Sequence, residues 1–318
     1  MDLILHIGTP KTGTSSLQQF LFVNHAALKT AGVLYPKSVL GPPHDPKYQP
    51  VFSCIYAGNA PALDECLGRI ADEADAGCGS VILSSEGFYH LMPDYTERSW
   101  DLIRMLAGRY RTQVVVYLRP QAEYLDSVYR QYLKNPRGIN PEYGSSMTIT
   151  ELLGHPRIAQ NLDYYGSLKR WAGAVGERNI VVRRYTKNVV GDFLAWLKVH
   201  ADGLVKPPDR NPSLTRTFAE VLRRMNDRLD NDARNRLIDR METYLLNRPR
   251  WRDQPFLSPA ERRALAARCK PDNDLVARTW LNDAELFTAD AAQDDAAWTP
   301  IELDQQALRS LVEEIMAT

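Results

Sequence analysis

Residues 3–22 read "LILHIGTPKTGTSSLQQFLF", and this stretch decides the fold of the chain. It opens with a short apolar run of β-forming residues at 3–8. The glycine-containing segment "HIGTPKTGTSS", residues 6–16, overlaps the end of this run. Apolar side chains then recur at helical spacing, at Leu17, Phe20 and Leu21. The order strand, glycine loop, helix predicts the beginning of an α/β fold.

Similar apolar runs occur further along the chain, with amphipathic helical stretches between them. They lie at residues 32–36, 80–86, 112–119 and 179–185. Continuous Val, Ile and Leu runs that alternate with helices are typical of a parallel sheet covered on both faces. The sequence therefore predicts a P-loop-type parallel β-sheet flanked by helices, with ligands at the carboxyl ends of its strands.

The remainder of the chain changes character after "KPPDRNPSLT", residues 206–215, and becomes wholly helical. Helices are expected near residues 215–247, 258–268, 272–281 and 303–316. We expect one domain over residues 1–318, with an α/β core at 1–205 and a helical extension at 206–318 packed on it. Segments 37–50 and 135–147 are rich in Pro and Gly and predict long loops, which either recognise a substrate or merely connect elements.

Composition restricts the classes of partner. Lys and Arg number 39, and Asp and Glu also number 39, so no overall field attracts nucleic acid or an acidic membrane. The four cysteines form no C-x-x-C pair and are expected to be reduced thiols. Nowhere do eighteen apolar residues run together, and no signal-type segment precedes Leu3. We expect a cytoplasmic protein without membrane insertion, and the sequence leaves its oligomeric state open.

The glycine loop departs from the nucleoside-triphosphate pattern at one position. That pattern is Gly, four free positions, Gly, Lys, then Ser or Thr. Gly8, Gly13 and Ser15 match it, but Thr14 occupies the lysine position and Lys11 lies inside the loop. The amides of residues 12–15 begin a helix and can hold a phosphate or sulfate group, beside the charge of Lys11.

Acidic ligands for magnesium are sparse in the predicted strands. The run at 112–119 ends in Arg119, and the run at 80–86 offers Glu86 alone. A group that carries less charge than a γ-phosphate can be transferred with lysine and backbone donors, because less developing charge needs neutralising.

The chain here resembles the sulfotransferases that use 3′-phosphoadenosine 5′-phosphosulfate. Their first signature, P-K-x-G-T-x-x-L, matches "PKTGTSSL" at residues 10–17. Their second, an Arg at a strand end and a Ser eight residues on, matches Arg119 and Ser127 in "YLRPQAEYLDSVYRQYL", residues 117–133. Ser127 lies two turns into the following helix, so both side chains can reach one phosphate. Taken singly, Arg119 also fits an ordinary ion pair and Ser127 a helix surface.

The resemblance is greatest to bacterial, carbohydrate-type members. It implies transfer of a sulfuryl group from 3′-phosphoadenosine 5′-phosphosulfate, with adenosine 3′,5′-bisphosphate as product and no metal requirement. The acceptor implied is a hydroxyl or amine of a small molecule or glycan, such as a carbohydrate or glycolipid. The resemblance assigns donor binding to Lys11, Thr12, Gly13, Thr14, Ser15, Arg119 and Ser127.

Transfer needs a positive group on the leaving oxygen, which Lys11 suits, and a base that removes the acceptor proton. The sequence offers two candidates for the base. His44 lies in the Pro-rich loop after "VLYP" and is the first choice, because an imidazole accepts a proton near neutral pH. Glu86 lies at a strand's ligand end and is the second. The alternative interpretation of His44 is an exposed loop histidine, and that of Glu86 is an acid at a helix N-terminus. His6 is interpreted as a residue that packs in the core.

Two other function classes stay open at this point. One is a kinase or nucleotide hydrolase that uses magnesium and ATP, and the other is a non-catalytic module that binds a nucleotide or glycan. The segment "RRMNDRLDNDARNRLIDR", residues 223–240, predicts a salt-bridged helix surface, or arginines that bind an acidic acceptor.

Overall fold

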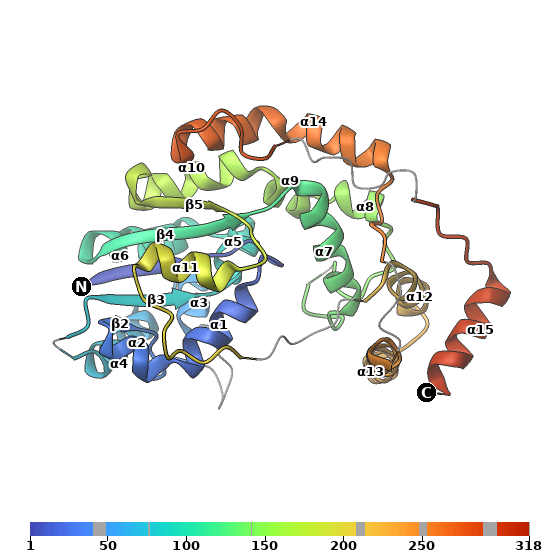
Figure 1. The fold of residues 1–318 in the computed structure, drawn as a ribbon, viewed down its shortest axis with the longest axis horizontal. Coiled ribbons are helices and arrows are strands. Elements are labelled where there is room, and N and C mark those ends of the chain that lie inside the picture. Colours follow the sequence, from blue (N-terminus) through green and yellow to red (C-terminus); the bar gives the residue numbers. More distant parts are fainter. Residues whose placement is uncertain are drawn as a thin grey trace. The chain divides into compact units, whose positions relative to one another are not determined.

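The computed structural model describes residues 1–40, 49–75, 77–140, 142–207, 214–247, 253–288 and 298–317 (Figure 1). The chain forms two compact units, each built from segments that are distant in sequence. The first unit comprises Met1–Arg119, Gln160–Asp209 and Pro271–Phe287. The second comprises Pro120–Ala159, Arg210–Lys270 and Thr288–Thr318.

A five-stranded parallel sheet lies at the centre of the first unit. Its strands are β1 (Asp2–His6), β2 (Val33–Leu34), β3 (Ser80–Ser84), β4 (Arg111–Leu118) and β5 (Ile180–Arg184). Their spatial order is β2-β3-β1-β4-β5, and every neighbouring pair is parallel. The predicted α/β fold with a parallel sheet is confirmed, and the carboxyl ends of all the strands point to one edge.

Helices cover both faces of this sheet. In Figure 1, α1 and α11 lie on the near side, where they contact each other, and α3, α5 and α6 lie behind the strands. Helices begin here at short polar side chains that accept an amide hydrogen bond, such as Thr96 before α6 and Asp163 before α10. The helical segments of this unit are α1 (Thr14–Val23), α2 (His25–Thr30), α3 (Gln49–Tyr56), α4 (Ala60–Glu73), α5 (Gly87–His90), η1 (Met92–Asp94), α6 (Glu97–Arg109), α10 (Tyr164–Val175), η2 (Glu177–Asn179), α11 (Val189–Leu197) and η3 (Ala277–Leu281).

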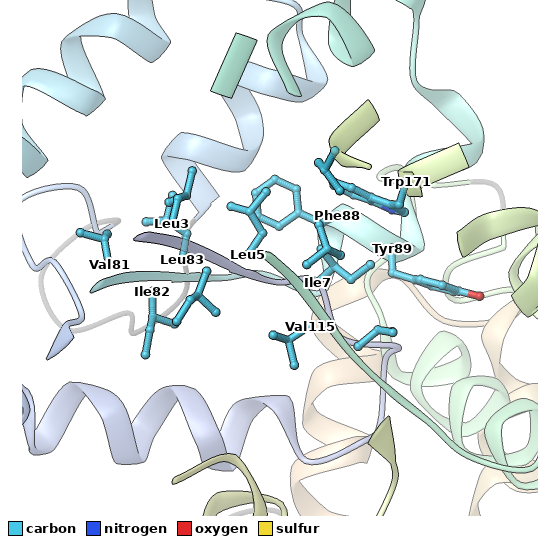
Figure 2. Packing of buried hydrophobic residues seen from close by; sticks show 14 of the residues in the cluster. Leu3, Leu5, Ile7, Val81, Ile82, Leu83, Phe88, Tyr89, Val115 and Trp171 are labelled. Carbon is cyan, nitrogen blue, oxygen red and sulfur yellow. The ribbon is translucent and has the colours of Figure 1, made fainter. Parts of the chain in front are cut away.

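The core forms on the two faces of the central strands. Figure 2 shows Leu5, Phe88 and Trp171 together on one face, with Val115 on the other. All four side chains are fully buried. Burying an aliphatic or aromatic side chain of this size contributes about 1.5–3 kcal/mol, so β1 is held mainly by apolar packing. This packing fixes the loop that follows β1.

The second unit is helical. It contains α7 (Gln121–Lys134), α8 (Ile149–Leu153), α12 (Arg216–Asn226), α13 (Asn231–Asn247) and α15 (Gln305–Met316). Helix α12 contacts both α7 and α13, and α13 contacts α15. Helices α9 (Pro156–Leu162) and α14 (Pro259–Val276) run across the boundaries between the units. Residues 135–140 and 142–147 contain no helix or strand, as expected for this segment.

Two helix predictions need correction. The predicted helix at 215–247 is broken between α12 and α13, where the Asp230 carboxylate accepts from the Ala233 amide at 2.7 Å and starts a new helix. The predicted interruption near residue 270 is absent, because α14 continues through Pro271. Pro271 is exposed, so the carbonyl that loses its amide partner there can bind water. No helix among the described residues is long and apolar enough to span a membrane.

Candidate functional site

The loop between β1 and α1 has an unusual backbone. We call residues 8–15 the anion loop. Its backbone is left-handed at Gly8 (φ 43°), Lys11 (φ 68°) and Gly13 (φ 78°). Left-handed residues placed between right-handed ones turn successive amides toward one side, as in anion-binding nests. No described side chain caps the N-terminus of α1, so its first amides are left for a ligand or water.

Both glycines of the loop are required by close contacts. A Cβ on Gly8 would lie 2.7 Å from Thr14 Oγ1, and a Cβ on Gly13 would lie 2.7 Å from Val189 Cγ1. A side chain at either position would push the loop away from α1 or α11. The tight turn therefore brings the amides close to whatever the loop binds.

Hydrogen bonds to neighbouring segments pin the loop. Thr9 Oγ1 donates to the Tyr117 carbonyl at 2.8 Å, and Thr12 Oγ1 donates to the Thr9 carbonyl at 2.7 Å. Tyr117 belongs to β4, so the loop is tied to the strand beside β1. These bonds preorganise the loop before any ligand arrives.

Thr14 differs from the other threonines of the loop. Its hydroxyl oxygen is buried and has no hydrogen-bond partner among the described residues. An unsatisfied buried hydroxyl is costly, and in native proteins it usually marks a bound water, ion or functional site. The hydroxyl lies at the N-terminus of α1, the end of a helix that favours anions.

Arg119 meets the anion loop directly. It follows the last residue of β4, and its Nη1 donates to the Lys11 carbonyl at 3.1 Å. The Tyr164 hydroxyl donates to the Arg119 carbonyl at 2.9 Å, and the guanidinium lies over the Tyr185 ring, 5.1 Å from its centroid. The structure thus brings together two of the predicted site residues, Lys11 and Arg119, and gives Arg119 an aromatic support.

Ser127 is the predicted partner of Arg119. It lies in α7, is half-buried, and belongs to the second unit, whereas Arg119 ends a segment of the first. That Arg119 and Ser127 bind the same phosphate remains a prediction.

The two predicted bases differ in what is known of their surroundings. Glu86 immediately precedes α5, and its carbonyl accepts from the His90 amide at 2.9 Å. The Ser85 amide donates to the His6 carbonyl at 3.1 Å, so this turn follows the end of β1 at the same edge of the sheet as the anion loop. His44 lies outside the described residues.

A buried polar network next to the loop was not predicted from the sequence. His6 Nδ1 lies 2.7 Å from Ser84 Oγ, and Gln18 Nε2 donates to the same hydroxyl at 3.2 Å. Burial lowers the pKa of His6 to about 3, so the imidazole is neutral at physiological pH. His6 does pack in the core as interpreted, with its ring edge-on to Tyr117. The missed signal is the register, because His6 and Ser84 pair directly across β1 and β3.

Among the described residues, no group of three His, Cys, Asp or Glu side chains could hold a metal ion. No family model matches the chain. An uncharacterized protein of Archaeoglobus fulgidus is 24% identical in an alignment 249 residues long, which covers 74% of this chain and 63% of that relative's length. A solved sulfotransferase from Alicyclobacillus acidocaldarius shares 19% identity with a TM-score of 0.40, covering 66% of this chain and 86% of that one.

Proposed function

We propose that this chain is a sulfotransferase that moves a sulfuryl group from 3′-phosphoadenosine 5′-phosphosulfate to a hydroxyl or amine. The observation that carries the proposal is the unsatisfied Thr14 hydroxyl at the start of α1, in a left-handed loop that holds Lys11 against Arg119. The loop has no lysine at the position that a triphosphate loop uses, but its donors suit a less charged group.

Each donor of the anion loop has a separate role in this proposal. The amides of residues 12–15 and the Thr14 hydroxyl hold the phosphosulfate end of the donor. The Lys11 ammonium neutralises the negative charge that develops on the bridging oxygen as the sulfur–oxygen bond breaks. Arg119, with Ser127, binds the 3′-phosphate at the other end.

The acceptor hydroxyl loses its proton as its oxygen forms the new bond to sulfur. In our proposal His44 or Glu86 takes that proton, and the new bond forms in line with the one that breaks. A carbohydrate or glycolipid acceptor remains part of the proposal, as do a cytoplasmic location and the assembly of both units into one domain.

A nucleotide titration tests the proposal. We expect wild type to bind adenosine 3′,5′-bisphosphate more tightly than ADP with magnesium, as measured by calorimetry. Arg119→Ala should remove this preference, because a guanidinium to a phosphate forms strong charge-assisted hydrogen bonds. Tighter binding of ADP with magnesium would instead support a kinase or nucleotide hydrolase.

The base assignment needs a turnover assay with labelled donor and a panel of acceptors. His44→Ala or Glu86→Ala should lower turnover with little change in bisphosphate affinity, because a base acts on the acceptor proton and not on the donor. Unchanged turnover in both variants would refute the assignment. A protein that binds the bisphosphate but transfers nothing would be a binding module.

A further inference from the structure

A buried arginine in the second unit has no acidic partner among the residues that the structure describes. Arg234 lies in the first turn of α13 and is fully buried. Among the described residues, its guanidinium donates to neutral oxygens alone, which are Asn226 Oδ1 at 2.7 Å, the Leu133 carbonyl at 2.8 Å, the Asn135 carbonyl at 3.1 Å and Asn231 Oδ1 at 3.2 Å. These bonds use four of its five N–H groups, but its full charge has no counter-charge in the ion pairs of the described chain.

The C-terminal end of α7 places partial negative charge beside the Arg234 guanidinium. The Leu133 carbonyl belongs to the last turn of α7, where the helix dipole places partial negative charge. An arginine cannot lose its proton in a protein, so burial alone does not remove the charge. Burial lowers the pKa of Arg234, and the nearby positive charge of Arg137 lowers it further.

Arg137 adds a second positive charge to the same place. Its backbone amide donates to Asn231 Oδ1 at 3.2 Å, and its Nε donates to the Gly144 carbonyl at 3.2 Å. Its Nη2 is buried and has no hydrogen-bond partner within the described part of the chain. A charged N–H that is buried without an acceptor calls for a water molecule or an anion.

The backbone is shaped to let the two arginines approach. Gly144 has a left-handed φ of 60°. A Cβ on Gly144 would lie 2.7 Å from Arg137 Cγ and 3.0 Å from Arg234 Nη2. A glycine at this position therefore leaves room for both side chains.

Neighbouring charged groups are engaged elsewhere. Lys134 forms an ion pair with Glu242, and the Asp230 carboxylate caps α13 through the Ala233 amide. Within the described chain, neither Arg137 nor Arg234 forms an ion pair with a carboxylate. The pair thus retains two positive charges that the described residues leave unbalanced.

We propose that Arg137 and Arg234 form a second anion site, which binds a tetrahedral oxyanion, sulfate or phosphate, either free or as an ester on a sugar. Arg137 contacts the anion through its outer nitrogens, because a guanidinium edge matches two oxyanion oxygens at once. Arg234 contributes mainly its charge, since four of its five N–H groups already donate within the protein. Arg234 belongs to the arginine-rich segment 223–240, and Arg137 belongs to the Pro- and Gly-rich segment 135–147. The sequence left the roles of both segments open.

Sulfate binding in a Lys11→Ala background tests this site, because that substitution weakens sulfate binding at the anion loop. The melting temperature is followed against sodium sulfate, with sodium chloride at matched ionic strength. We expect a rise that saturates in Lys11→Ala and is lost in Lys11→Ala with Arg137→Gln. Sulfate also stabilises proteins without binding a site, but that contribution does not saturate and should be the same in every variant.

Arg236→Gln is the matched control, because it removes one exposed arginine from the same helix and should leave the saturating rise intact. Arg137→Lys keeps the positive charge but lacks the paired N–H groups of the guanidinium, so it should weaken sulfate binding without abolishing it. This variant keeps the test valid if Arg137→Gln fails to fold. A rise that persists in Arg137→Gln, or no saturating rise in Lys11→Ala, would overturn the proposal.

Calorimetry with glucose 6-sulfate and with inorganic sulfate identifies the source of the anion. Tighter binding of the sugar ester, with no binding of glucose, would indicate a charged glycan, and equal binding would indicate the free ion. Both results require loss of binding in Arg137→Gln. Because Lys11 is already replaced, failure here would leave the proposed sulfotransferase activity unaffected.

Discussion

The anion loop and the cluster around Arg130 treat polar groups in opposite ways. Arg130, in α7, is almost fully buried and donates to Asp126, to Asp253 and to the Leu214 and Gln254 carbonyls. Every nitrogen of this guanidinium has an acceptor. The anion loop instead leaves the Thr14 hydroxyl unsatisfied and holds Lys11 in a left-handed conformation.

This difference separates polar groups that stabilise the protein from polar groups that await a ligand. Satisfied buried networks hold a fold in place, whereas unsatisfied buried groups and strained residues are common at functional sites. Substitutions in the Arg130 cluster should therefore reduce stability, and substitutions in the anion loop should reduce binding while sparing stability.

The largest expected effect is on stability. Arg130→Ala should lower the free energy of unfolding by about 3 kcal/mol, because it leaves two carboxylates without their buried partner. We expect the lower end of the usual range, since 41% of the Asp253 side chain is exposed and can be hydrated. Urea denaturation measures this loss. Arg236→Ala, at an exposed position, should change stability by less than about 0.5 kcal/mol, and equal losses would contradict the comparison.

Lys11→Gly should separate binding from stability in the loop. Glycine adopts a φ of 68° without strain, so the free energy of unfolding should rise by about 0.5–1 kcal/mol. Loss of the ammonium should weaken bisphosphate binding by about 10- to 100-fold, the value of a charge-assisted hydrogen bond. Calorimetry and urea denaturation measure the two effects. Lys11→Ala should lose the same bisphosphate affinity without the gain in stability. A Lys11→Gly protein that binds the bisphosphate as tightly as wild type would exclude the proposed role of the Lys11 ammonium in donor binding.

The fold was largely predictable, because parallel strands buried on both faces appear as continuous apolar runs. The run at 112–119 became β4 and the run at 179–185 became β5, each within one residue at either end. Helix ends were harder to predict. A carboxylate cap such as Asp230 is hard to recognise among many charged residues, and Pro271 broke no helix because its neighbours face solvent.

The candidate site was predictable only where its chemistry is local. The spacing of Gly8, Lys11 and Gly13 indicated an anion loop, since the backbone conformation depends on neighbouring residues. The His6, Ser84 and Gln18 network depends on which strands pair, and the contact of Arg119 with Lys11 depends on strand order. These contacts join residues far apart in sequence, so no local pattern could reveal them.

His6 sharpens the comparison because it lies between the two classes: among the described residues Nδ1 contacts Ser84 Oγ, whereas the buried Nε2 has no partner. Its pKa falls from about 6.5 unfolded to about 3 folded, so the unfolded state binds more protons between these values. The contribution of neutral His6 to the free energy of unfolding should be fully present above pH 6.5. Below that pH the free energy of unfolding should decrease by about 1.4 kcal/mol per pH unit, or by about 2 kcal/mol at pH 5. Urea denaturation at pH 7, 6 and 5 measures this slope. His6→Asn should show a slope smaller by that amount, and identical slopes would mean that His6 is protonated in the folded protein.

Thr14 and Thr12 give the smallest effects but the most direct contrast, because both hydroxyls are in one loop and only one has a partner. Thr12→Val removes a hydroxyl that donates to the Thr9 carbonyl, and should cost about 1 kcal/mol of stability. Thr14→Val replaces an unsatisfied hydroxyl by a methyl group of similar volume, so the free energy of unfolding should stay the same or rise by up to about 1 kcal/mol. Bisphosphate affinity should fall about five- to tenfold in Thr14→Val, the value of one hydrogen bond, and less in Thr12→Val, whose backbone amide is unchanged. If calorimetry and urea denaturation showed equal losses of stability and full binding in both variants, the Thr14 hydroxyl would have a partner within the protein, and the anion loop would be as fully satisfied as the cluster around Arg130.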